Sequence, residues 1–497
     1  MLISAEGGVL SRSTANPSLA NGHLAIWLTC SAFLLGSITV GSGQPWLLPF
    51  FVALAYTAIL ITAISSVRTL RDSLNPLCLI CAIAFVRHLL PGLFLLNGAE
   101  PPDEVRRFFD AMKLSEGDWR WGHALALWGL LAALVGWFLV QQSRVRNGPR
   151  KIDFHLVPGV KPAACVGMLL GFAALSVFLV SNASLDVITS GAFRGTTIQQ
   201  GTGKYFFLAY LLISGSVLLS CYYLAGGQKA VALVPVASAT LFYWILGGRN
   251  RAIVSLAAGL LLLWYHHRQR DGWPKVTMNY RYIFMAPAVM FSVLWVSYMG
   301  ALYRGELGAR AFSDGMSLQG ITEYLQASIY TDLGQLHSLA GAIAIGPGIL
   351  GGQTFFGALS WPLNAFIFIP GRSAGVFIVE TLVGFAGEGD KWAVNASLIG
   401  DAYLNFGLWG VPAVMMLYGA ILKTLYVKFR QGRLHAAIYV LVFICSLQMS
   451  WGSIEVWPQT LTILAFAWGI HFVGRNVLQI DHSGAIPPAG YKHGQVR

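Results

Sequence analysis

Long apolar runs recur along most of this chain, and they constrain its fold more than any other feature. A helix needs roughly 20 mostly apolar residues to cross the ~30 Å hydrocarbon core of a bilayer. Runs that meet this requirement lie at approximately 23–42, 46–67, 74–96, 121–141, 160–181, 204–225, 229–247, 250–266, 281–302, 398–422, 436–452 and 456–474. Because hydrocarbon cannot satisfy backbone polar groups, such runs fold as helices. The sequence therefore predicts an all-α polytopic membrane protein with about twelve transmembrane helices.

The composition favours the same fold class. Of the 497 residues, 56% are hydrophobic and only 11% are charged, whereas soluble domains carry about 25% charged residues. The 22 residues before the first run are polar, and the run lacks a convincing cleavage site, so we interpret it as the first span. All six cysteines lie in apolar runs, where packing is a commoner role than metal binding, for Cys78 and Cys81 as well. We expect no cofactor and no metal.

The positions of the basic residues predict the orientation of these helices. In a twelve-span arrangement, one side of the membrane holds 20 of the 33 lysines and arginines. The same side holds only five acidic residues, namely Glu6, Asp72, Asp153, Asp271 and Asp481. Basic residues collect in cytoplasmic loops, so this side is the cytoplasmic one and both termini lie on it. This explains the net charge of +12 without a nucleic-acid partner.

One large loop dominates the opposite, outer side. The expected order is a cytoplasmic tail over 1–22, nine spans over 23–302, the loop over 303–395, three spans over 396–475 and a tail over 476–497. The loop contains two apolar pieces, 337–350 and 355–369, each interrupted by a proline. Because each piece is short and broken, we expect re-entrant or interfacial helices there. If both pieces crossed the membrane, the orientation of the other twelve spans would not change, so fourteen spans remain an alternative.

Several arginines lie where the orientation rule gives no reason for a cation. Arg249 and Arg251 occupy a G-G-R-N-R hairpin on the outer side, between the seventh and eighth spans. The glycines let the backbone approach a ligand closely, and guanidinium groups suit a diphosphate. The alternative is that both side chains anchor a short hairpin at the interface or pair with a loop carboxylate.

Other cations extend this outward pattern. Arg87 lies within the third span, where a charge is costly and marks either a site or a buried ion pair. Arg194, Arg304 and Arg372 lie on the outer side in glycine-containing segments. Their recurrence near the lipid headgroups favours an anionic lipid substrate.

Candidate acid–base groups lie on the same side as these arginines. Deprotonating a sugar hydroxyl requires a carboxylate or an imidazole near the reacting carbon. The candidates that we favour are Asp332, His337 and Asp401, although each alone is more often an ordinary loop residue. The chain has no phosphate-binding Walker A sequence, no zinc signature and no G-x-S-x-G, so an ATPase, a metalloprotease or a serine hydrolase is unsupported.

Four local patterns accompany the predicted architecture. They are the G-G-R-N-R hairpin, F-R-G with G-T-G-K-Y, G-G-Q-T-F-F-G-A-L-S-W-P with F-I-P-G-R, and A-S-L-I-G-D-A-Y-L-N-F-G-L-W-G-V. With about twelve spans and one late outer loop, they make the chain similar to the Wzy-type polymerases of O-antigen and exopolysaccharide repeat units. The chain departs from that family at two points. Asp401 stands where the family often has glutamate, and Gly371 separates Pro370 from Arg372 where the family frequently has I-P-R.

The resemblance implies a GT-C-like membrane fold and a glycosyltransferase of the bacterial inner membrane. Its substrates would be oligosaccharides linked to undecaprenyl diphosphate, joined at the periplasmic face without a nucleotide sugar. A protein that regulates chain length is a further candidate partner, besides the lipid bilayer itself. The diphosphate-binding residues would be Arg87, Arg194, Arg249, Arg251, Arg304 and Arg372, and the catalytic residues would come from Asp332, His337 and Asp401.

Three other classes remain open at the level of sequence. An O-antigen ligase shares the architecture and the chemistry, and His337 in the large loop is compatible with it. A flippase or another transporter would explain Arg87, but the large outer loop and the lack of a detectable repeat argue against it. The last alternative is a membrane scaffold without catalytic activity.

Overall fold

The computed structural model describes eight continuous stretches of the chain and several isolated positions. The stretches are 110–140, 160–182, 203–224, 336–360, 374–384, 396–430, 438–443 and 456–476, and the isolated positions are Leu54, Thr57, 75–77, Ile80, Arg87, Arg106, 237–238, Ser446 and Ile454. Within these residues the secondary structure is helical and includes no strand, which confirms the all-α prediction for this part of the chain.

Four helices lie where the apolar runs predict them. They are α6 (Glu116–Leu139), α7 (Val160–Asn182), α9 (Gly203–Leu224) and α20 (Val456–Asn476). The largest difference is at the start of α6, which begins five residues before the predicted run at 121. The cause is a capping box, in which Ser115 Oγ accepts from the N–H of Asp118 and the Asp118 carboxylate accepts from the N–H of Ser115. Apart from the run at 398–422, the other predicted spans lie wholly or mostly outside the described residues.

Helix α18 (Ser397–Arg430) differs most from its predicted run at 398–422. It continues for two turns beyond Lys423, whose charge ended the apolar run, and its last turn carries Lys428 and Arg430. Cations in a last turn interact favourably with the helix dipole. The helix is also interrupted at Gly407, whose φ of 70° and ψ of −165° are essentially restricted to glycine. An apolar pattern alone does not reveal such a break.

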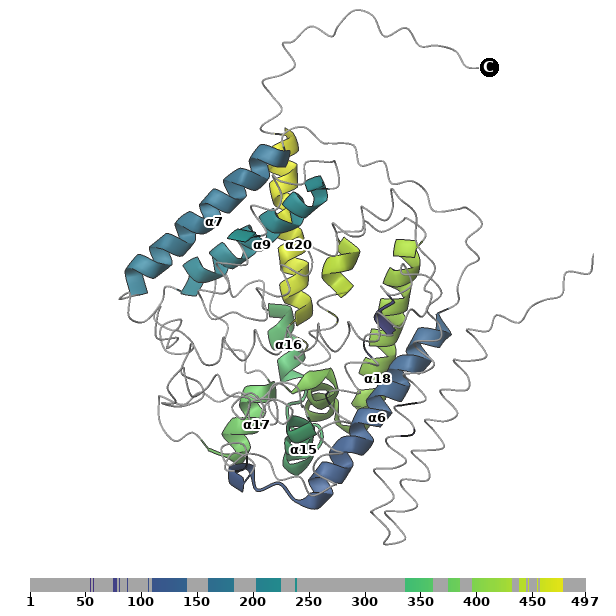
Figure 1. The fold of residues 1–497 in the computed structure, drawn as a ribbon. Coiled ribbons are helices and arrows are strands. Elements are labelled where there is room, and N and C mark those ends of the chain that lie inside the picture. Colours follow the sequence, from purple (N-terminus) through teal and green to yellow (C-terminus); the bar gives the residue numbers. More distant parts are fainter. Residues whose placement is uncertain are drawn as a thin grey trace, which may run out of the picture.

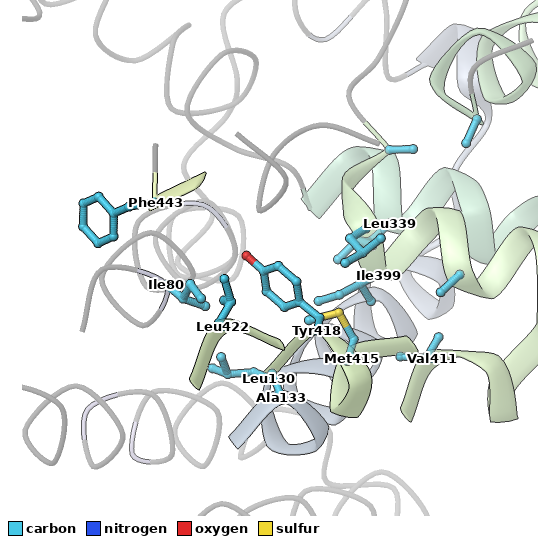
Figure 2. Packing of buried hydrophobic residues seen from close by; sticks show 14 of the residues in the cluster. Ile80, Leu130, Ala133, Leu339, Ile399, Val411, Met415, Tyr418, Leu422 and Phe443 are labelled. Atoms are coloured by element: carbon cyan, nitrogen blue, oxygen red, sulfur yellow. The ribbon is translucent and has the colours of Figure 1, made fainter. Parts of the chain in front are cut away.

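Helices α6 and α18 pack against each other along one side of the described part, and they run parallel (Figure 1). A Cβ atom placed on Gly136 would overlap the carbonyl oxygen of Met416, and one placed on Gly419 would overlap that of Ala133. The two backbones therefore touch at a crossing that only small residues permit, as in many membrane helix pairs. Figure 2 shows Tyr418 of α18 among the apolar side chains of this core. Its hydroxyl donates a hydrogen bond of 2.9 Å to the carbonyl of Ser446.

A second group contains α7, α9 and α20, which contact one another (Figure 1). Gly167 of α7 faces Ser216 of α9, and Gly171 faces Ile213, so these two helices are antiparallel. Helix α20 approaches α9 closely at Gly215, where an added Cβ would lie 3.2 Å from the backbone nitrogen of Ala467. Glycine again sets the distance between the helices.

Three short helices come from the region of the predicted outer loop. They are α15 (Leu336–Ile345), α16 (Gln353–Ser360) and α17 (Ala374–Leu382). None is long enough to cross a bilayer. Helix α15 packs against α6, α17 and α18, and its Leu339 and Ala342 are completely buried. The two apolar pieces of the loop thus include short helices that join the core of the bundle.

Two of the described helices are long and apolar enough to span a membrane, Gly117–Leu139 and Ser397–Arg430. Shorter apolar helices occur at Pro162–Phe178, Leu208–Ser220 and Thr460–Gly474. Large apolar side chains remain exposed on α7, α18 and α20, among them Val180 (86%), Trp409 (79%) and Trp468 (69%).

Candidate functional site

The structure places three of the predicted site residues. Asp401 lies in the first turns of α18, His337 lies in the first turn of α15, and Arg87 is a partly buried residue with helical backbone geometry. The remaining six predicted site residues, Asp332, Arg194, Arg249, Arg251, Arg304 and Arg372, lie outside the described residues. The candidate site therefore centres on Asp401.

A turn rich in glycine separates α15 from α16 and packs against the break in α18. Gly346, Gly348, Gly351 and Gly352 all have positive φ angles, between 53° and 112°, so the chain reverses sharply without side-chain clashes. A Cβ placed on Gly407 would lie 3.5 Å from the Cβ of Pro347, which puts the turn directly beside the break.

Backbone hydrogen bonds join the turn to the broken helix. The N–H of Gly348 donates to the carbonyl of Tyr403 at 3.0 Å, and the N–H of Leu350 donates to the carbonyl of Leu404 at 2.9 Å. Both carbonyls lie within one turn of Gly407, where the helical dihedral angles are interrupted. Buried backbone groups must find partners, and here the N–H groups of the turn at 346–352 satisfy carbonyls of the interrupted helix α18.

Asp401 lies in the middle of this junction, and each of its carboxylate oxygens is hydrogen-bonded. Oδ1 accepts from Thr354 Oγ1 of α16 at 2.5 Å and from Asn405 Nδ2 at 2.9 Å. Oδ2 accepts from the backbone N–H of Ile454, just before α20, at 3.0 Å. The carboxylate thus joins three segments that are far apart in the sequence.

Thr354 and Asn405 are also joined to each other by two hydrogen bonds. The backbone N–H of Thr354 donates to Asn405 Oδ1 at 3.3 Å, and Asn405 Nδ2 donates to Thr354 Oγ1 at 2.5 Å. Asn405 Nδ2 additionally contacts the carbonyl of Asp401 at 2.7 Å. The three side chains therefore form one connected polar network, in which the positions of α16 and α18 depend on each other.

This network is completely enclosed. Asp401 is 0% exposed, and Asn405 and Thr354 are each 2% exposed. Burying an ionised carboxylate costs several kcal/mol unless hydrogen bonds or a countercharge compensate for it. Among the described residues, the polar partners of Asp401 are uncharged donors. A costly group kept in this position is typical of a functional site in a membrane protein.

The two residues before Asp401 in the sequence pack closely against other helices, and this packing fixes the direction of the Asp401 side chain. A Cβ on Gly129 of α6 would lie 2.8 Å from Ile399, and a Cβ on Gly400 would lie 3.3 Å from Leu339 of α15. Close packing on these sides leaves the carboxylate pointing toward α16 and Ile454. Small residues at 129 and 400 are what allow the approach.

His337 and Arg87 do not join this network in the described part of the chain. His337 is buried at 7% exposure, and no hydrogen bond connects it with Asp401. Arg87 is partly buried and has interaction partners of its own. Of the three predicted site residues that the structure describes, Asp401 is the one that lies in the junction.

Sequence reasoning missed Thr354 and Asn405. Both lie in segments that carry the family resemblance, G-G-Q-T-F-F-G and G-D-A-Y-L-N-F-G. The spacing of Asp401 and Asn405, four residues apart on one helix face, was the available signal. Nothing in the sequence links Thr354 to them, because that contact spans 47 residues.

The donors around Asp401 do not resemble a metal site. Thr354, Asn405 and Ile454 present O–H and N–H groups to the carboxylate, whereas a cation needs lone pairs. Among the residues that the structure describes, no group of three His, Cys, Asp or Glu side chains could hold a metal ion. The network can orient the carboxylate and hold or receive a proton there.

Comparison of the chain with protein families, with curated proteins and with solved structures finds no match.

Proposed function

We propose that this chain is a membrane-embedded glycosyltransferase that polymerises lipid-linked oligosaccharides. It would transfer a growing glycan from undecaprenyl diphosphate to a second lipid-linked repeat unit, at the periplasmic face of a bacterial inner membrane. The observation that carries the proposal is the enclosed Asp401 network, where the interrupted helix α18 meets α16 and the turn before it. This junction contains both G-D-A-Y-L-N-F-G and G-G-Q-T-F-F-G, two of the segments that resemble the Wzy-type polymerases.

The membrane setting has independent support. The parallel direction of α6 and α18 is what the fourth and tenth of twelve alternating spans require. The antiparallel direction of α7 and α9 is what the fifth and sixth spans require. Exposed apolar side chains such as Trp409 and Leu417 are costly in water and favourable in lipid. We take these features as support for the twelve-span, GT-C-like arrangement.

In the proposed reaction, Asp401 is the general base. The bond between the anomeric carbon and the lipid diphosphate breaks, and the acceptor oxygen forms the new glycosidic bond. The acceptor hydroxyl gives its proton to the Asp401 carboxylate once the hydrogen bond from Thr354 opens to admit it, and undecaprenyl diphosphate leaves. Arg249 and Arg251, with the other outward arginines, would stabilise the charge that develops on the departing diphosphate. Enclosure limits water, which would otherwise hydrolyse the donor.

A transporter of lipid-linked sugars is the second candidate. Its supporting observation is the junction itself, because interrupted helices that meet around a polar group form the binding sites of many transporters. An O-antigen ligase would use the same chemistry as the polymerase with a different acceptor. The three functions predict different products when the site is disabled.

The deciding experiment replaces Asp401 with Asn in cells and identifies the glycans that remain. A polymerase defect leaves single repeat units on the final acceptor. A ligase defect leaves long polymer on undecaprenyl lipid, and a transport defect leaves repeat units on the cytoplasmic face. Asp118→Asn, in the capping box of α6, is the matched control and should retain polymer when both variants reach the membrane in equal amounts.

A further inference from the structure

The far end of α18 carries a second polar arrangement, distinct from the Asp401 network. We define the cation–aromatic cluster as Trp137, Lys423, Tyr426, Arg430 and Tyr439. The Lys423 ammonium lies 4.6 Å from the centre of the Trp137 ring, and the Arg430 guanidinium lies 5.9 Å from that of Tyr426. The rings of Trp137 and Tyr426 are 5.9 Å apart, and those of Tyr426 and Tyr439 are 6.3 Å apart.

Lys423 is the unusual member of this cluster. It is only 7% exposed, yet among the described residues its ammonium makes no hydrogen bond and no ion pair. An ammonium has three donors, and the face of Trp137 compensates for only part of its lost hydration. The C-terminal dipole of α6 favours a cation here but supplies a partial charge without a hydrogen bond. Among the residues that the structure describes, no carboxylate is paired with this cation, so the cluster can accept an anionic ligand.

The other cluster residues suit an anion that approaches from the membrane interface. Lys423, Tyr426 and Arg430 are spaced at i, i+3 and i+7, so they share one face of α18. Arg430 also donates to the Tyr426 hydroxyl, at 3.4 Å, which holds the guanidinium beside the rings. Tyr and Trp are enriched at the depth of lipid headgroups, and lysine has a long stem that reaches such a group.

We propose that the cation–aromatic cluster binds a phosphate group, that of an anionic phospholipid in the cytoplasmic leaflet. A phosphodiester provides acceptor oxygens for the ammonium of Lys423 and for the guanidinium of Arg430. Basic sites between helices on this side of a membrane are suited to anionic headgroups. The inference depends on the chain spanning the membrane with the end of α18 inside, and it does not depend on glycosyl transfer.

The test measures how phosphatidylglycerol changes the thermal unfolding midpoint of the purified protein in detergent. The wild-type midpoint should rise with added phosphatidylglycerol and not with phosphatidylcholine. Lys423→Met keeps the length and apolar stem of the side chain but removes the charge. It should weaken the lipid dependence about tenfold, because one charge-assisted hydrogen bond is lost. Arg430→Gln should weaken it by a smaller factor, and Lys423→Arg should retain most of it.

Lys428→Met is the matched control, since Lys428 is an exposed cation near the same end of α18 and has no place in the cluster. It should respond to phosphatidylglycerol as the wild type does. An equal response of Lys423→Met and wild type would overturn the proposal, as would a full response of the wild type to inorganic phosphate alone, which would indicate a site for free phosphate. If Lys423→Met does not fold, an unchanged response of Arg430→Gln would have the same consequence. Loss of glycan polymerisation would bear on the proposed reaction and not on this site.

Discussion

The two halves of α18 show opposite relations between polarity and burial. In the N-terminal half, 397–406, the residues from Ser397 to Asn405 are buried, although they include a carboxylic acid and an amide. In the C-terminal half, 408–430, large apolar residues such as Trp409 and Leu417 are exposed on one face. A soluble protein hides apolar side chains and exposes polar ones. The reversed arrangement is what we expect of the proposed membrane protein, in which lipid would surround one half of the helix and protein encloses the polar network at the other.

The forces that hold the two halves differ as well. The N-terminal half is held by hydrogen bonds from α16 and from the turn at 346–352, which must form together. The C-terminal half is held by a close backbone crossing with α6 at Gly136 and Gly419. Substitutions in the C-terminal half should therefore reduce stability most, whereas those in the N-terminal half should affect activity beyond their effect on stability.

The largest effect on stability is expected at the crossing. In Gly419→Ala, the new methyl group would overlap the carbonyl of Ala133, so the backbones must separate. We expect a loss of about 3 kcal/mol in the free energy of unfolding, at the upper end for an overpacked core. Reversible unfolding in mixed detergent micelles measures it. Gly469→Ala in α20 is the control, because an added Cβ there has no neighbour within 4 Å, and it should be neutral or slightly stabilising. Equal losses in both variants would show that the crossing is not close.

The break in α18 at Gly407 should show the next largest loss of stability on substitution. Gly407→Ala keeps ordinary contacts, since its Cβ would lie 3.5 Å from that of Pro347, but the backbone conformation is strained for any residue except glycine. We expect a loss of about 2 kcal/mol, together with loss of polymer in cells at equal protein levels. If α18 were continuous in the active protein, alanine would instead stabilise it, and the same unfolding measurement would show a gain.

The helices could be predicted from the sequence more completely than the break in α18 or the polar network. Apolar runs predicted α7, α9 and α20 to within two residues, because an apolar run of this length favours a helix over a strand. The break at Gly407 was not predicted, because a glycine within an apolar helix is ordinary and only its contact with the turn at 346–352 gives it a role. Asp401 was identified from the resemblance and from its charge. Its partner Thr354 was not, since a single threonine carries no signal until the fold brings α16 beside α18.

A smaller effect is expected within the polar network. Thr354→Val removes the hydroxyl that donates to Asp401 while keeping the shape of the side chain. The free energy of unfolding should fall by about 1–2 kcal/mol, since a buried acceptor loses one donor. Polymer formation should fall further than this loss of stability explains. Thr354→Ser retains the donor and should preserve most of the activity, and a valine variant with wild-type polymer length would remove Thr354 from the site.

The smallest effect is expected far from both halves, at the start of α6. Ser115→Ala removes the side chain that caps the first turn, which costs about 1 kcal/mol. The same unfolding measurement applies. Polymer length should not change, because the capping box lies outside the Asp401 network. A variant that loses polymer with only this small loss of stability would indicate that the start of α6 has its own role in the reaction.

The most direct test of the central claim exchanges the two side chains of the network. The double variant Asp401→Asn, Asn405→Asp keeps one carboxylate and one amide on the same helix face but moves the carboxylate by one turn. The measurement is polymer formation by the purified variant in proteoliposomes, with lipid-linked repeat units extracted from cells that lack the protein. We predict a folded protein, with an unfolding midpoint near that of the wild type, that forms no polymer. Polymer formation at the wild-type rate would show that the carboxylate at 401 has only a structural role, and would contradict the account.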